Sequence, residues 1–154
     1  MKKYKSLIYS LLISLGSGGL STLLAGGSME RYRSLRQPPL SPPGWIFPVV
    51  WTILFILMGI AAWLIWGSDS PDKHAALWLY AAQLAANIIW TPLFFGAGMY
   101  LAAFFLLLFL ELLIGLVIFQ FSRIDRRAAL LMVPYFVWVL FAGYLNLGVW
   151  ALNR

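Results

Sequence analysis

Residues 38–51 read Pro-Pro-Leu-Ser-Pro-Pro-Gly-Trp-Ile-Phe-Pro-Val-Val-Trp, and this stretch holds five of the eight prolines of the chain. Proline fixes φ, lacks a backbone N–H and pushes the preceding residue towards extended conformations, so the stretch cannot begin as an ordinary helix. It nevertheless leads directly into a long apolar segment. We therefore expect it to form a semi-rigid lid over one end of a helix bundle.

The composition places the chain in a membrane. Of its 154 residues, 62% are hydrophobic and only 10% are charged, whereas soluble domains are about 45–50% apolar and 25% charged. Apolar runs near or above the roughly 18 residues needed to cross a bilayer occur about five times and use nearly the whole length. The sequence predicts an all-α fold: one integral membrane domain, 1–154, with five transmembrane helices and no soluble domain.

The five helices are expected at 7–25, 45–66, 75–95, 99–121 and 128–152, with the lid loop at 27–43. The first apolar run follows three lysines and ends in small residues, as a secretory signal peptide does. It is also long enough to span the bilayer, so we expect a retained first helix.

The net charge of +6 comes almost entirely from short connections between the apolar runs. We therefore interpret it as an orientation signal and expect no nucleic-acid partner. Seven of the eleven Lys and Arg residues fall on the side of the N-terminus, which places that side in the cytoplasm and the lid loop outside. The chain has no Cys and one His, His74, so we expect no metal site and no cofactor.

Two helical stripes carry the candidate pocket, and both lie at the lid end of their helices. Positions spaced by three or four residues share one helix face, which groups Gln83, Asn87, Trp90 and Phe94 on one helix and Tyr135, Trp138, Ala142 and Leu145 on another. Buried amides are unlikely to face lipid. Together with Trp51, the stripes predict a slot for a flat hydrophobic ligand.

Tryptophans in membrane proteins often form belts at the interfaces, and this reading is favoured for Trp45, Trp63, Trp66, Trp78 and Trp150. Trp138 lies too deep for a belt, and Trp51 and Trp90 share the inner faces with prolines and amides. Ligand contact is favoured for these three, with plain helix packing as the alternative.

Two further features lie outside the pocket. Glu111 falls in mid-membrane, where a carboxylate is costly; a protonated side chain bonded to a neighbouring helix is favoured over a proton relay. Small residues four apart on the third helix form a plausible homodimer seam: Ala81, Ala82, Ala85 and Ala86.

Three blocks together resemble the translocator protein family, also called tryptophan-rich sensory proteins or peripheral-type benzodiazepine receptors. They are the proline stretch 38–51, the block Asn-Ile-Ile-Trp-Thr-Pro-Leu-Phe-Phe-Gly at 87–96, and Pro-Tyr-Phe-Val-Trp at 134–138 with Phe-Ala-Gly-Tyr-Leu-Asn at 141–146. The resemblance covers essentially the whole chain and is that of a bacterial member.

The resemblance implies a multi-pass protein of the bacterial cell membrane, often dimeric. Members of the family that it resembles bind porphyrins, notably protoporphyrin IX, and synthetic isoquinoline carboxamide or benzodiazepine ligands, in a pocket under the first loop. The family's pocket corresponds here to Tyr32, Pro42, Trp51, Asn87, Trp90, Trp138, Ala142, Leu145 and Asn146. Some bacterial members promote light- and oxygen-dependent porphyrin breakdown, and the tryptophans associated with it match Trp51 and Trp138.

The sequence departs from the family in one respect. Animal members follow the Leu-Asn pair with a tyrosine and then an arginine in a cholesterol-recognition pattern, whereas Leu147 and Ala151 stand here. We therefore expect no high-affinity sterol binding. Three functions stay open: a porphyrin receptor or transporter, an enzyme that degrades porphyrin by photo-oxidation, and a non-catalytic regulator whose lid signals to a partner protein.

Overall fold

The computed structural model describes residues 2–26 and 29–154. The helices are α1 (Lys2–Ala25), α2 (Met29–Ser34), α3 (Ile46–Trp66), α4 (Lys73–Thr91), the π-helical segment η1 (Pro92–Gly96), α5 (Tyr100–Ser122) and α6 (Arg126–Asn153). Within the described residues, five helical segments are long and apolar enough to cross a membrane, with α4 and η1 counting as one. The predicted all-α membrane bundle is confirmed.

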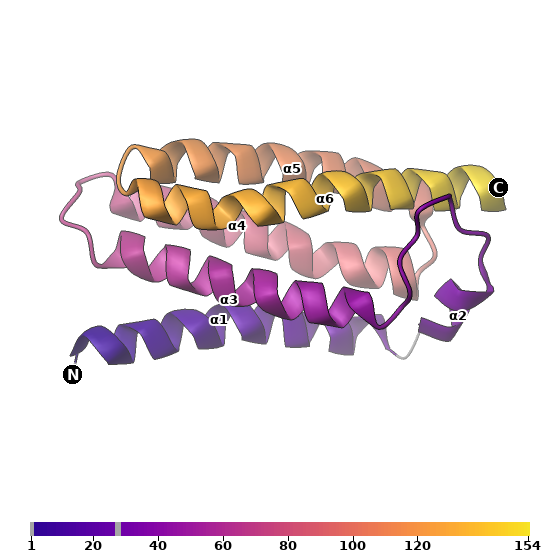
Figure 1. The fold of residues 1–154 in the computed structure, drawn as a ribbon, viewed down its shortest axis with the longest axis horizontal. Coiled ribbons are helices and arrows are strands. Elements are labelled where there is room, and N and C mark those ends of the chain that lie inside the picture. Colours follow the sequence, from indigo (N-terminus) through magenta and orange to yellow (C-terminus); the bar gives the residue numbers. More distant parts are fainter. Residues whose placement is uncertain (1, 27–28) are drawn as a thin grey trace.

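The five long helices form a closed ring. α1 packs against α3 and α4, α3 against α6, α6 against α5, and α5 against α4. Figure 1 shows the N-terminus at one end of the bundle, together with the α3–α4 and α5–α6 connections, while α2 and the C-terminus lie at the other end. The ring therefore combines contacts between consecutive helices, α4 with α5 and α5 with α6, with contacts between helices far apart in the sequence, α1 with α4 and α3 with α6.

Small residues let α1 approach α3 closely, as expected for membrane helices. The hydroxyl of Ser10 donates to the Gly59 carbonyl over 2.6 Å, and that of Ser14 donates to the Phe55 carbonyl over 2.5 Å. A Cβ atom on Gly59 would lie 2.9 Å from a Leu11 methyl. The contact thus depends on the absence of a side chain there.

The boundaries differ most from the expected ones in two places, and elsewhere by one or two residues. α1 begins at Lys2 rather than residue 7, because its basic first turn extends beyond the apolar run. α4 ends at Thr91, where Pro92 cannot donate to the helical ladder. The chain continues as the π-helical turn η1, which is closed by the Ala97 N–H donating to the Pro92 carbonyl over 2.9 Å.

The lid loop 27–43 contains a short helix, α2, that the sequence analysis did not predict; its residues 27 and 28 lie outside the described part. Hydrogen bonds attach the lid to the bundle. Arg31 donates from Nη1 to the Gly96 carbonyl over 2.8 Å, and the Arg36 backbone exchanges bonds with the Asn153 amide. In Figure 1 the chain after α2 passes beside the end of α6 before it enters α3.

The proline run itself rests on α6. Pro38 is buried, and a Cβ atom on Gly148 would lie 2.5 Å from its ring. Tyr144, one turn earlier on α6, donates its hydroxyl to the Pro39 carbonyl over 2.7 Å. The lid is therefore seated on α6 by both packing and hydrogen bonding.

Glu111 on α5 is half-buried, and within the described residues neither of its carboxylate oxygens has a hydrogen-bond partner. The expected bond to a neighbouring helix is therefore absent from this part of the chain. On α4, Ala81, Ala82 and Ala85 are exposed and Ala86 is buried. The homodimer seam stays a prediction.

Candidate functional site

A cavity of about 340 Å³ lies between α1, α3 and α4 near the lid end. Its lining is mostly apolar and aromatic, as in small-molecule sites generally. The lining residues are Gly18, Ser21, Thr22 and Ala25 from α1; Phe47, Pro48, Trp51 and Phe55 from α3; and Asn87, Trp90, Thr91 and Phe95 from α4 and η1.

The α1 wall is made of small residues. A Cβ atom on Gly18 would lie 2.5 Å from the Phe55 ring, so only glycine leaves that ring in its place. Ser21 donates its hydroxyl to the Ile88 carbonyl over 3.1 Å and joins α1 to α4. This wall therefore combines a close helix contact with open space beside it.

Aromatic rings form the opposite walls. The Trp51 ring lies 5.7 Å from that of Phe55 and 6.5 Å from that of Trp90, with interplanar angles of 31° and 35°. Trp90 also stacks on Phe94 at 5.3 Å. Tilted indole and phenyl rings of this kind present flat faces that suit a planar aromatic ligand.

A buried polar chain runs behind the cavity between α4 and α6. Asn87 donates from Nδ2 to the Tyr135 hydroxyl over 2.7 Å, and that hydroxyl donates to Gln83 Oε1 over 2.8 Å. All three side chains are buried. Among the described residues Asn87 Oδ1 has no hydrogen-bond partner, so it is available as an acceptor in the cavity wall.

Trp90 is held by a second polar chain. Its Nε1 donates to Asn146 Oδ1 on α6 over 3.1 Å, and Asn146 Nδ2 donates to the Tyr100 carbonyl over 2.7 Å. Asn146 therefore fixes the orientation of the Trp90 indole and also occupies a carbonyl at the start of α5. This one side chain connects three helices.

A second, much smaller cavity of about 20 Å³ lies beyond Trp90 towards α6. Its lining residues are Tyr32, Phe47, Trp90, Phe94, Phe95, Ala142, Leu145 and Asn146. Phe47, Trp90 and Phe95 line both cavities and separate them.

The lid enters this region through Tyr32 on α2, which is 4% exposed. Its ring lies 5.8 Å from Phe47 and 5.4 Å from Phe95. Burial raises the pKa of the Tyr32 hydroxyl above its ordinary value. The side chain therefore closes the lid end of the aromatic cluster as a neutral phenol.

The structure distributes the predicted ligand-binding residues over two spaces. Trp51, Asn87 and Trp90 line the larger cavity, and Tyr32, Trp90, Ala142, Leu145 and Asn146 line the smaller one. Trp138 and Pro42, both half-buried, line neither of these two cavities. Trp138 instead contacts Phe47, with ring centroids 6.0 Å apart, and Phe47 in turn lines the larger cavity.

The sequence did not point to the α1 wall, or to Phe47, Phe55 and Phe95. The cluster of small residues in α1 was a usable signal for Gly18, because it indicated close packing. Phe47, Phe55 and Phe95 carried no such signal, since phenylalanine is common throughout a membrane-spanning sequence.

The sequence of this chain is similar to those of known membrane proteins. A profile of the TspO/MBR family matches residues 9–151. The chain belongs to the TspO/MBR family. Family members similar to it include the tryptophan-rich protein TspO of Chlorobaculum tepidum, which is 37% identical over 96% of this chain and 94% of that protein.

Two other family relatives come from distant organisms. The protein CrtK of Rhodobacter capsulatus is 40% identical over 79% of this chain and 78% of that protein. The translocator protein of Bos taurus is 36% identical over 95% of this chain and 88% of that protein. The expected membership of the translocator and tryptophan-rich sensory protein family is thus confirmed, and with it a multi-pass membrane protein.

Proposed function

We propose that this protein is a membrane receptor or transporter that binds a metal-free tetrapyrrole, protoporphyrin IX, in the cavity between α1, α3 and α4. The observation that carries the proposal is the pair of offset indoles of Trp51 and Trp90, 6.5 Å apart, beside the free acceptor Asn87 Oδ1. Indole faces stack on a planar macrocycle, and the amide oxygen gives the same wall one polar contact point.

The charged groups fit the same ligand. The cavity lies near the lower end of the roughly 300–1,000 Å³ range of small-molecule pockets, so the carboxylate edge of the ring would remain outside it. Arg31, Arg33 and Arg36 are exposed at the lid. Guanidinium groups bind carboxylates through charge-assisted hydrogen bonds. We therefore assign these lid arginines as the binding partners of the two propionates.

The test is a protoporphyrin titration followed by the absorbance of the bound porphyrin, so that the number of tryptophans does not affect the signal. Removing one indole contact worth about 0.5–1.5 kcal/mol weakens binding roughly 2- to 12-fold. We expect this loss for Trp51→Phe and Trp90→Phe, and none for Trp78→Phe, whose indole is 77% exposed on the outside of α4. If all three variants bound protoporphyrin as tightly as the unmodified chain, the proposed pocket would be rejected.

Trp138→Phe is the informative fourth variant. Because Trp138 does not line the larger cavity and contacts it only through Phe47, we expect a smaller loss than for Trp51→Phe. An equal loss would show that the bound porphyrin extends past Phe47 to Trp138 and occupies both cavities.

Photo-oxidation is the second candidate function, and the position of Trp51 in the cavity wall favours it. In this scheme the excited porphyrin takes one electron from the Trp51 indole and passes it to O₂, which gives an indole radical cation and superoxide. The indole radical cation then takes an electron from the porphyrin and returns to indole, and the porphyrin radical cation combines with superoxide to form a dioxygen adduct of the ring. Illumination of the complex should then give a discrete product that Trp51→Phe does not form. If the complex bleaches only as fast as free porphyrin, the protein is a carrier and not an enzyme. If, in addition, a partner protein binds to it only when porphyrin is bound, it is a regulator.

A further inference from the structure

A third cavity, larger than the other two, lies at the opposite end of the bundle from the lid. It measures about 650 Å³ and is lined by Lys2, Lys3, Ser6, Trp63, Leu64, Trp66, Gly67 and Arg127. These residues come from the first turns of α1, the last turns of α3 and the start of α6. None of them belongs to the porphyrin cavity.

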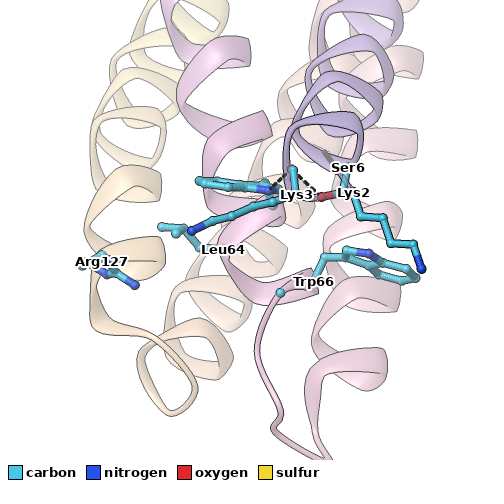
Figure 2. A pocket seen from close by; sticks show the side chains of 8 residues that line it. Lys2, Lys3, Ser6, Leu64, Trp66 and Arg127 are labelled. Atoms are coloured by element: carbon cyan, nitrogen blue, oxygen red, sulfur yellow. Dashed lines mark hydrogen bonds between the residues drawn. The ribbon is translucent and has the colours of Figure 1, made fainter.

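Three cationic side chains line this space. Figure 2 shows Lys3 extending towards the side on which Arg127 lies, while Lys2 runs down beside Trp66. Within the described residues the ammonium groups of Lys2 and Lys3 have no carboxylate partner. Arg127 pairs with Asp125 over 2.9 Å, but its Nη1 takes no part in that contact. Like charges around one cavity repel each other, and a bound anion relieves that repulsion.

The backbone adds to the positive potential. The first N–H groups of α1 have no intrahelical partner, and the positive end of its dipole is at Lys2. The carbonyls at the end of α3 would repel an anion, but Lys73 donates to the Trp66 carbonyl, the last of the helix, over 3.1 Å, and to the Ser68 carbonyl beyond it over 3.0 Å. Lys73, which does not line the cavity, thus offsets part of the negative potential at this end of α3.

The apolar residues of the lining favour an anion that carries an apolar group over a small soluble anion. Trp63 donates from Nε1 to the Lys3 carbonyl over 3.1 Å. The Lys3 ammonium lies over the Trp63 ring, 5.7 Å from the ring centroid. Trp66 is exposed, and Leu64 lies between the charged groups. Indoles beside lysines at the end of a spanning helix are typical of the headgroup level of a bilayer. A small soluble anion would leave these apolar surfaces uncovered.

We propose that this cavity binds the phosphate of an anionic glycerophospholipid, with the phosphate between Lys2, Lys3 and Arg127 and the glycerol against the indoles. Basic pockets between transmembrane helices bind phospholipid headgroups in this manner. The site lies at the far end of the bundle from the porphyrin cavity, so its occupancy and porphyrin binding can be measured separately.

The test uses the full-length protein in neutral detergent, titrated with phosphatidylglycerol or with phosphatidylcholine of the same acyl chains. Bound lipid is counted by native mass spectrometry, and the melting temperature is followed in parallel. We expect phosphatidylglycerol to bind preferentially. Since a direct hydrogen bond to a charged group contributes roughly tenfold or more to binding, the double variant Lys2→Gln/Lys3→Gln should bind it at least about tenfold more weakly.

The matched control is Lys5→Gln/Arg126→Gln, which removes two charges at the same end from exposed residues that do not line the cavity. It should bind phosphatidylglycerol almost as the unmodified chain does. An equal loss in both double variants would mean diffuse attraction and overturn the site. Millimolar inorganic phosphate or glycerol phosphate that gives the same thermal shift would identify a small-anion site and overturn the lipid assignment.

Discussion

The Trp90 indole and the Asn146 side chain join α4 to α6: Nε1 of the first donates to Oδ1 of the second over 3.1 Å. Trp90 is a wall of both cavities, and Asn146 also binds the Tyr100 carbonyl at the start of α5. The orientation of the most central indole of the site is therefore set by a residue from another helix.

Replacing Asn146 by alanine should affect both stability and binding. It leaves the buried Trp90 Nε1 without a partner, which costs about 1–3 kcal/mol, and it frees the ring to turn. We expect a lower melting temperature and weaker protoporphyrin binding. In a double-mutant cycle, Asn146→Ala should cost less in a Trp90→Phe background, because no indole donor is then left unsatisfied. Additive losses would contradict the role assigned to this bond.

Gly148→Ala should loosen the lid. The added Cβ would lie 2.5 Å from Pro38, so the proline run must move away from α6. We expect faster trypsin cleavage after the lid arginines and faster release of bound porphyrin. Gly143→Ala on the same helix is the control, because its Cβ would meet nothing within 4 Å. Similar cleavage rates in both variants would show that the lid is not held by this contact.

Gly18→Ala should reduce the space available to a ligand. Its Cβ would lie 2.5 Å from the Phe55 ring, which must then shift next to the cavity. Overpacking of this kind costs about 1–3 kcal/mol, so we expect both a lower melting temperature and weaker porphyrin binding.

Gly19→Ala is the matched control for that substitution, since a Cβ at Gly19 meets nothing within 4 Å. Glycine to alanine in a helix interior is worth up to about 1 kcal/mol in favour of the helix, so the control should be neutral or slightly stabilised. A loss of affinity in the control as large as in Gly18→Ala would point to a change in α1 as a whole.

Tyr32 predicts a pH dependence at the alkaline end. Its pKa in the folded protein is raised by burial above the ordinary 10.0. The folded state therefore holds the phenol proton where the unfolded chain releases it, and stability is lost as the pH rises above about 10 towards the folded pKa. Melting temperatures of the unmodified chain should fall relative to Tyr32→Phe above that pH and run parallel to it below. Parallel curves throughout would mean that Tyr32 is solvated.

The sequence alone was sufficient for the fold class, because spanning a bilayer requires long apolar helices and the chain has five of them. It also brought out Asn87 and Trp90 on one face of one helix, since the helical repeat fixes which positions share a face. It did not predict α2, whose six residues carry no apolar periodicity, nor the π-helical turn that follows Pro92.

Only the tertiary structure decided which stripes meet. Helix order around the ring is set by packing, and it places α1 beside both α3 and α4, so the larger cavity opens among these three helices. The same order leaves Trp138 outside the lining of that cavity and in contact with Phe47, which no spacing along the chain could reveal. The periodicity of a helix determines its faces, whereas the partner of each face depends on side-chain volumes across the whole bundle, such as the missing Cβ atoms at Gly18 and Gly148.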